Sequence, residues 1–177
     1  MATLGMFEPN EKSQHAMGSI AGIRFTPGMV FAVDGPENLG PEAAGAVIVL
    51  HATLTSDSMA QTFYQKNADI MRTLRESPGF IRFMGIGDGY SLYGLGFWKT
   101  PETAAAFAKA QAHSVAVRDL NEAPYQYSQF AGIWAAQSVR PRRFFCDKCQ
   151  RPNAAPAAAC SACGNPLVDV FKEQAKR

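Results

Sequence analysis

Residues 46–54 read AVIVLHATL, a run rich in β-branched side chains that predicts a strand. Residues 55–58 read TSDS and offer N-caps for a helix, whose apolar side chains recur at helical spacing as far as Leu74. A Pro-Gly dipeptide at 78–79 ends that helix, and residues 80–85 read as a second strand. The middle of the chain therefore predicts a strand–helix–strand unit.

The residues that follow extend this unit into a recognisable order. An Asp-Gly dipeptide at 88–89 predicts a hairpin that leads into a strand at 90–99. Thr100 caps an alanine-rich helix that is expected to continue to about Asn121, and a last strand covers 125–135. The order strand, helix, strand, strand, helix, strand is the ferredoxin-like split βαβ plan, so an α+β fold is predicted.

Both helices of that plan lie on one face of the sheet and leave the other face bare. The bare face must carry aromatic and aliphatic side chains, and proteins commonly cover such a face with a second copy. We therefore expect a homodimer in which two sheets form a dimeric α+β barrel.

The four cysteines of the chain form two CxxC pairs separated by ten residues, Cys146 with Cys149 and Cys160 with Cys163. Two such pairs supply four thiolates from two tight turns, which suits tetrahedral Zn²⁺ in a closed, structural site. Gly164 can adopt a positive φ that brings backbone amides towards the sulfurs. The stretch between the pairs is mostly Ala, Pro and Asn and has no core of its own, so the metal must supply the folding free energy. A single iron or two disulfides remain the alternatives. The tail resembles the zinc-ribbon family and, more loosely, rubredoxin-like modules.

A second resemblance rests on motifs of the central region. These are Ser-Pro-Gly-Phe at 77–80, Gly-Phe-Trp at 96–98, Lys-Thr-Pro-Glu at 99–102 and His113 well along the second helix. Together they resemble the antibiotic-biosynthesis monooxygenase family, over about half the chain. That family consists of dimeric α+β barrels and includes haem-degrading monooxygenases. Its members range from cofactor-free quinone-forming oxygenases to haem enzymes, so the resemblance implies the fold more closely than the reaction.

The resemblance singles out His113 among the candidate site residues. Many members carry a histidine on the second helix, and in the haem-degrading branch a histidine there ligates iron. His113 is therefore a candidate axial ligand or acid/base, against the alternative of an ordinary helix histidine. Haem-degrading members also place an asparagine on the first strand, near the position of Leu50, which this sequence does not match.

Four further residues are candidates with alternatives left open. Trp98 either walls a cavity or packs beneath the helix, and His51 lies mid-strand on a face that alternation alone does not decide. Asn67 either hydrogen-bonds a substrate or caps a turn. Arg82 either pairs with a carboxylate or propionate, or is a solvated strand arginine. The aromatic residues that could line a pocket or pack at an interface are Tyr90, Tyr93, Phe130 and Trp134.

The first forty-five residues do not match the antibiotic-biosynthesis monooxygenase family. Residues 19–25 and 29–33 read as a hairpin around a Pro-Gly turn, followed by a linker rich in proline and glycine. The predicted organisation is an N-terminal arm at 1–45, a ferredoxin-like domain at 46–138 and a zinc ribbon at 139–177.

Charge and composition limit the classes of protein. The chain has 177 residues, of which 47% are hydrophobic, with a net charge of +2. Residues 138–177 hold eight basic and three acidic residues, or +5, which leaves nine and twelve, or −3, for the rest. No apolar run is long enough to span a membrane, and the N-terminus lacks the pattern of a secretory signal, so a cytoplasmic location without membrane association is expected. Nucleic acid is not the expected partner, although the basic tail permits it.

The favoured function is a monooxygenase-like enzyme that uses O₂ on a small aromatic or haem-type substrate in an apolar cavity. It would be either haem-dependent through His113 or cofactor-free. No flavin or nicotinamide fingerprint is present, because the glycines at 85–89 fall in a hairpin and not before a helix. The alternative is a non-enzymatic dimeric ligand-binding module whose basic ribbon docks on protein or nucleic acid.

Overall fold

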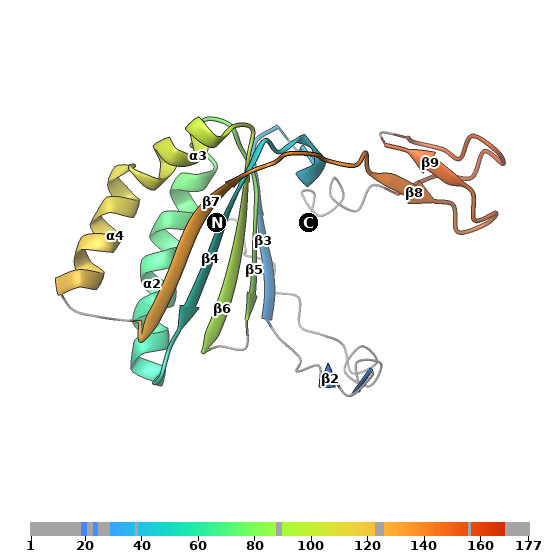
Figure 1. Cartoon of the computed structure of the whole chain (residues 1–177). Coiled ribbons are helices and arrows are strands. Elements are labelled where there is room, and N and C mark those ends of the chain that lie inside the picture. Colours follow the sequence, from blue (N-terminus) through green and yellow to red (C-terminus); the bar gives the residue numbers. More distant parts are fainter. Residues whose placement is uncertain are drawn as a thin grey trace.

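The chain folds around a five-stranded antiparallel sheet with the strand order β3-β5-β6-β4-β7 (Figure 1). The computed structural model describes residues 19–20, 23–24, 29–37, 39–87, 90–122, 126–155 and 157–168. The strands of the sheet are β3 (Met29–Asp34), β4 (Ala46–Thr53), β5 (Phe80–Gly87), β6 (Ser91–Trp98) and β7 (Ser128–Ala135). Short pairs are β1 (Ser19–Ile20) with β2 (Ile23–Arg24) and β8 (Arg143–Phe145) with β9 (Pro152–Ala154).

The ferredoxin-like order is confirmed by the topology. The chain passes through β4, helix α2 (Asp57–Leu74), the β5–β6 hairpin, a second helical segment and β7. Strand β4 lies between β6 and β7, with Ala46 opposite both Trp98 and Ala135. The Asp-Gly turn predicted at 88–89 lies outside the described residues.

The second helix is broken where one continuous helix was predicted. Helix α3 (Pro101–Ala108) begins in a capping box between Thr100 and Thr103, and α4 (Gln111–Glu122) follows it. At the break, the Lys109 N–H donates a hydrogen bond to the Ala106 carbonyl and closes a tight turn. The Ser114 hydroxyl donates a hydrogen bond to the Lys109 carbonyl. Alanine-rich sequence does not signal this change of direction, which is made by local side-chain and turn hydrogen bonds.

The main core lies between the sheet and the helices, around Trp98. Trp98 is 1% exposed and packs its ring against Phe80 and Phe107, with ring centroids 5.3 and 5.1 Å away. Gly96 makes this placement possible, because a Cβ there would lie 2.3 Å from the Trp98 ring. A second cluster around Phe63 and Leu92 continues the core along the sheet.

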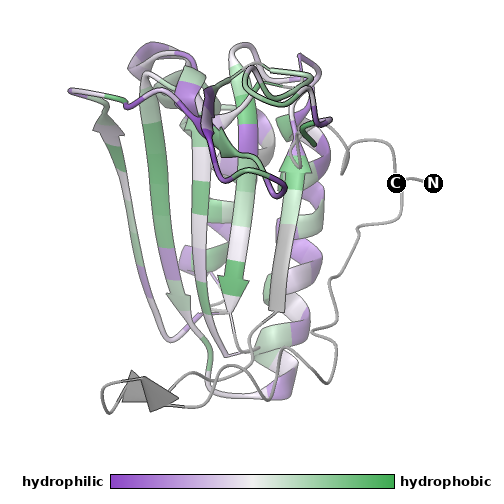
Figure 2. Cartoon of the chain, turned by 90° about the vertical axis from the view of Figure 1, so that its right-hand side faces the viewer, coloured by the Kyte–Doolittle hydropathy of each residue, from purple (hydrophilic) through white to green (hydrophobic). Residues whose placement is uncertain are grey.

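The other face of the sheet carries no helix among the described residues (Figure 2). Its large side chains are strongly exposed: Ile86 at 42%, Tyr93 at 53%, Phe130 at 53% and Trp134 at 46%. This is the bare apolar face that the helix placement predicted. No helix in the described part of the chain has the length and apolar character needed to cross a membrane.

The predicted N-terminal hairpin is wrong in its pairing. Strand β3 pairs with β5, from Met29 opposite Gly87 to Asp34 opposite Arg82, whereas the described residues before it, β1 and β2, pair with each other. Strand β5 would otherwise present an unpaired edge, and β3 satisfies its backbone groups. The predicted Pro-Gly turn at 27–28 lies outside the described residues. The linker that follows contains a short 3₁₀ helix, Pro41–Ala43.

Candidate functional site

A cavity of about 220 Å³ lies between the sheet and the helical layer. Its walls are mainly aliphatic and aromatic side chains from β4, β5, β7, α2 and α3. Three residues with polar atoms join this lining, Asn67 from α2, Trp98 from the end of β6 and His113 from the first turn of α4. An apolar pocket with a few convergent polar groups is the usual form of a small-molecule site.

His113 contributes a buried basic atom to this site. Its Nδ1 is buried and has no hydrogen-bond partner among the described residues. Burial lowers the pKa of His113 below its ordinary value, although a hydrogen bond to the Ala108 carbonyl opposes this shift. The lowered pKa favours the neutral ring, in which either ring nitrogen can carry the proton. In the tautomer that carries the proton on Nε2, Nδ1 is a hydrogen-bond acceptor.

Trp98 and Asn67 supply the other polar groups. The indole Nε1–H of Trp98 is also buried without a partner among the described residues. Asn67 donates from Nδ2 to the Phe63 carbonyl at 2.9 Å, within its own helix. Buried donors and acceptors are normally paired, so two unpaired groups on side chains that line one cavity are candidates for pairing with a bound ligand. The structure thus brings three predicted site residues together, and Trp98 both packs in the core and walls the cavity.

The two other predicted residues do not line the cavity. Leu50 lines it, so the next residue of β4, His51, points to the bare face. There its Nε2 lies 3.1 Å from Ser91 Oγ, and its ring lies 4.3 Å from that of Tyr93. Arg82 is 2% exposed instead of solvated, and its Nη1 lies 3.2 Å from Asp34 Oδ1. The strand β3, whose pairing was not predicted, supplies that aspartate.

Haem does not fit the cavity. Sites for drug-sized ligands occupy about 300–1,000 Å³, a porphyrin is larger than such ligands, and this cavity is smaller than that range. Among the described residues, no lysine or arginine joins the lining to pair with propionates, and Arg82 lies elsewhere with Asp34. His113 could serve as an axial ligand, but one histidine does not make a cavity of this size and lining fit haem.

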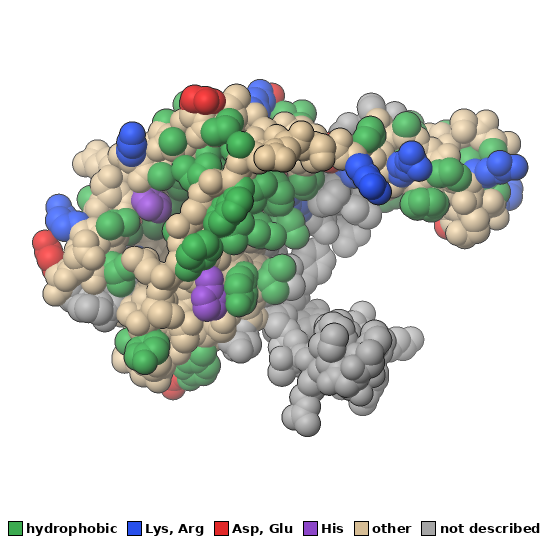
Figure 3. Space-filling view, viewed as in Figure 1, with side chains coloured by type: hydrophobic (Ala, Val, Ile, Leu, Met, Phe, Trp, Pro, Cys, Tyr) green, Lys and Arg blue, Asp and Glu red, His purple; other side chains and the backbone are tan. Residues whose placement is uncertain are grey.

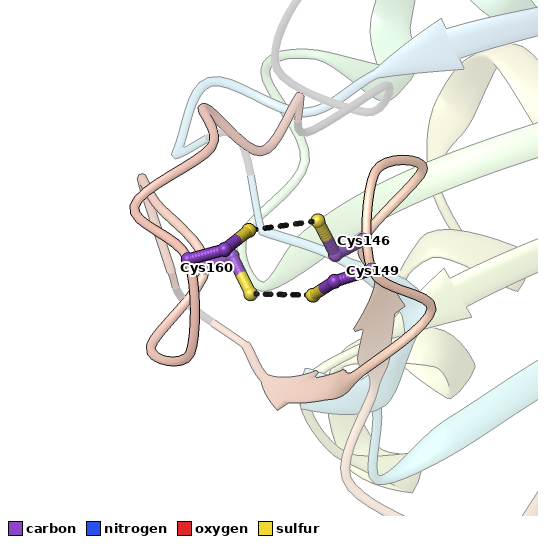
Figure 4. A group of neighbouring side chains, drawn as sticks. Cys146, Cys149 and Cys160 are labelled. Carbon is purple, nitrogen blue, oxygen red and sulfur yellow. Dashed lines mark hydrogen bonds between the residues drawn. The ribbon is translucent and has the colours of Figure 1, made fainter.

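The second candidate site is formed by the four cysteines (Figure 4). Their sulfur atoms lie within 4.8 Å of one another, with Cys146 to Cys163 and Cys149 to Cys160 both at 3.6 Å. All four thiols are free, and a disulfide would need about 2.05 Å. Sulfurs at the corners of a tetrahedron with metal–sulfur bonds of about 2.3 Å lie about 3.8 Å apart. The cysteines are therefore placed to hold a metal ion.

Two matching backbone turns present these cysteines. The Cys146 N–H donates to the Arg151 carbonyl at 3.0 Å, and the Cys160 N–H donates to the Asn165 carbonyl at 2.8 Å. Each turn ends in a residue of positive φ, Gln150 at 58° and Gly164 at 70°. The positive φ expected of Gly164 is confirmed, whereas Gln150 performs the same role without being a glycine.

The hydrogen bonds of the second turn act on its thiols. Hydrogen bonds from the backbone N–H groups of Ala162 and Cys163 and from the Asn153 side chain lower the pKa of Cys160 to about 6. At Cys163 the backbone N–H of Asn165 acts in the same direction, but burial and the neighbouring sulfurs outweigh it and raise the pKa to about 12. Four thiols this close cannot all ionise without a cation between them.

Asn153 is a site residue that sequence analysis missed. It is 6% exposed in β9, and its Nδ2 donates to the Arg151 carbonyl at 2.9 Å and lies 3.6 Å from Cys160 Sγ. Its Oδ1 accepts from the backbone N–H and the hydroxyl of Ser161, at 2.9 and 3.1 Å. This side chain therefore links the two turns. In the sequence it stands as one polar residue among alanines and prolines, which gives no signal of the role.

Comparison with known proteins finds similarity in solved structures. No family model and no curated protein matches the sequence. A proposed monooxygenase from Lactobacillus acidophilus shares 14% identity, with a TM-score of 0.46, over 59% of this chain and 47% of that chain. SnoaB, a cofactor-independent oxygenase from Streptomyces nogalater, shares 15% over 55% and 97%, with a TM-score of 0.41. LmHde, a heme-degrading enzyme from Listeria monocytogenes, shares 12% over 52% and 61%, with a TM-score of 0.40. The chain thus spans about half the length of the first of these proteins.

Proposed function

We propose that the protein is a monooxygenase-like enzyme that oxidises a small aromatic substrate in the cavity beside His113, without haem. The observation that carries this proposal is a pair of buried polar atoms without a partner among the described residues, His113 Nδ1 and Trp98 Nε1, on two side chains that line one apolar cavity. An acceptor and a donor together suit a ligand that carries a hydroxyl and an oxygen acceptor on an aromatic frame.

The chemistry follows from a neutral imidazole in an apolar cavity. His113 Nδ1 takes the proton of a substrate phenol, and the phenolate formed is electron-rich enough to react with O₂. A C–O bond forms at the carbon para to the oxygen, the O–O bond breaks, and the second oxygen atom leaves as water with the two hydrogens lost by the substrate. The phenol is thereby oxidised to a quinone, and the four electrons that it loses reduce O₂. The apolar walls exclude water from the phenolate.

A fluorescence titration tests whether the cavity binds such a molecule. The chain has two tryptophans, and Trp134 is 46% exposed on the bare face, so Trp134→Phe leaves the cavity tryptophan as the only indole. We expect 4-bromophenol, a quencher that acts on contact, to quench this variant saturably. The matched variant Trp98→Phe, which keeps Trp134, should show only a linear, unsaturated decrease. Linear quenching in both variants would contradict a phenol site at Trp98.

Haemin serves as the contrasting ligand. Because the cavity is small and its described lining contains no lysine or arginine, we expect titration with haemin to give no saturable shift of its Soret band. A saturable shift that is lost in His113→Ala would assign the site to haem and overturn the cofactor-free proposal.

The bare sheet face supports a homodimer. We expect light scattering to report about twice the 19.1 kDa chain mass. Phe130→Arg should give a monomer, because burying an arginine in an apolar interface costs several kcal/mol. Val117→Arg, an exposed position on α4, is the matched control and should remain dimeric. A parent protein that is monomeric at micromolar concentration would contradict the dimer.

We assign zinc to the four cysteines as a structural ion, since four thiolates close the tetrahedron and leave no position for substrate. Asn153→Ala should then weaken zinc binding about 10- to 100-fold, the usual effect of losing a hydrogen bond to a ligand. Competition with a chromophoric zinc chelator measures the affinity. Val168→Ala, exposed at the end of the ribbon, is the control. Equal affinities in Asn153→Ala and the parent would show that Asn153 does not support the metal.

A further inference from the structure

The ribbon carries an aromatic side chain that its own fold does not use. Phe145 of β8 is 65% exposed, although β8 belongs to a module that is poor in apolar side chains. Its neighbour Phe144 is half-buried, with the Arg142 guanidinium 5.1 Å from its ring centroid. Because side chains alternate along a strand, Arg143 and Phe145 share the exposed face of β8. Arg143 is opposite Ala154 and Phe145 is opposite Pro152, so small or flat residues flank them on β9.

Exposed basic side chains are spread over the ribbon that carries Phe145. The side chains of Arg140, Arg143, Lys148 and Arg151 are all exposed, and basic residues are spaced along the ribbon in Figure 3. Asp147, the one acidic residue between 138 and 168, already accepts a hydrogen bond from Asn165 at 2.7 Å. These cations also offset the negative charge of four thiolates around a divalent metal. That role does not account for an exposed phenylalanine, so Phe145 is the informative residue.

The position of the ribbon leaves this surface open. Arg142 Nε lies 3.0 Å from Glu42 Oε1, and both side chains are largely buried, which ties the start of the ribbon to the linker before β4. Beyond this contact the ribbon projects from the end of the sheet on the side away from the helices (Figure 1). The surface therefore faces solvent and not the cavity.

We propose that Phe145, with Arg143, Lys148 and Arg151, binds single-stranded nucleic acid without sequence preference. Unpaired bases stack on exposed aromatic rings, and neighbouring cations follow the phosphates. An acidic protein would satisfy the charges but has no use for a flat exposed ring on the same strand face as Arg143. The surface acts independently of the cavity and of the proposed oxidation.

Fluorescence anisotropy of the full-length, zinc-loaded protein tests the proposal. The probe is a labelled oligothymidylate of about 15 nucleotides, similar to the span of single-strand binding domains. We expect saturable binding, with Phe145→Ala about tenfold weaker or more and Phe145→Tyr close to the parent. A plot of log affinity against log salt should have a slope of about −2, for three phosphates, and Arg143→Gln should reduce its magnitude by about 0.7.

Control variants show whether weaker oligonucleotide binding comes from the loss of Phe145 itself or from damage to the ribbon or the cavity. Val168→Ala should bind as the parent does, and the metal content of every variant is measured. His113→Gln should also bind normally. The proposal is overturned if the parent does not bind at low salt. It is also overturned if Phe145→Ala binds as well as the parent, or if polyglutamate competes as effectively as unlabelled oligonucleotide, which would indicate a surface for acidic proteins.

Discussion

Replacing Cys160 with serine is expected to release the zinc completely and to unfold the ribbon while the sheet domain stays folded. Cys160 is 3% exposed, lies 3.6 Å from Cys149 Sγ and is within reach of the Asn153 amide. A serine hydroxyl does not ionise as a thiol does, so the site loses one of its four anionic ligands. The binding free energy of a structural zinc is about 10–16 kcal/mol, and in a module without a core this is its folding free energy.

Elemental analysis and hydrogen exchange together measure this result. The parent should contain about one zinc per chain and the variant none. Amides of the ribbon, such as those of Cys146 and Gly164 that hydrogen-bond within the turns, should lose protection, whereas those of β4 and β6 should keep it. Val168→Ala should behave as the parent. Absence of metal from parent protein purified without chelators would contradict the assignment, as would loss of protection throughout the sheet.

The order of the elements and the clustering of the four cysteines could be predicted from sequence because each rests on local patterns. The strand at 46–53 and helix α2 have clear periodicity, and a capping serine, Ser56, accepts from the Met59 N–H at 3.2 Å. The cysteine spacing predicted a cluster since two tight turns can bring four thiols together whatever surrounds them. The bare apolar face followed from the placement of the helices.

The parts that could not be predicted depend on contacts between distant segments. The pairing of β3 with β5 joins residues about fifty positions apart, and no sequence motif predicts it. The side to which His51 points and the burial of Arg82 both depend on that sheet assembly. The break between α3 and α4 depends on one serine hydroxyl and a tight turn at Lys109, and it sets where His113 enters the cavity wall. Asn153 acts through hydrogen bonds that only the folded ribbon creates.

His113→Gln is expected to lower the turnover of a phenolic substrate about 10²- to 10⁴-fold, the usual contribution of a general base. Glutamine keeps a polar side chain of similar size but does not accept a proton near neutral pH. The parent should also show a characteristic pH dependence. Burial holds the pKa of His113 below its ordinary value, so the base is neutral at and above pH of about 6.5, and turnover should fall as pH drops through the lowered pKa. Val117→Ala, exposed on the same helix, should keep both the rate and the pH profile.

Oxygen uptake by the cofactor-free protein tests the central claim most directly. A panel of hydroxylated aromatic compounds that the fluorescence titration shows to bind is supplied with O₂, and O₂ consumption is measured together with quinone absorbance. We predict that the parent consumes one O₂ for each quinone formed, with no haem, flavin or added metal. The rate of O₂ consumption should be at least a hundredfold lower in His113→Gln. Binding without O₂ consumption in the parent, or equal rates in the parent and His113→Gln, would contradict the assignment of an oxygenase site at His113.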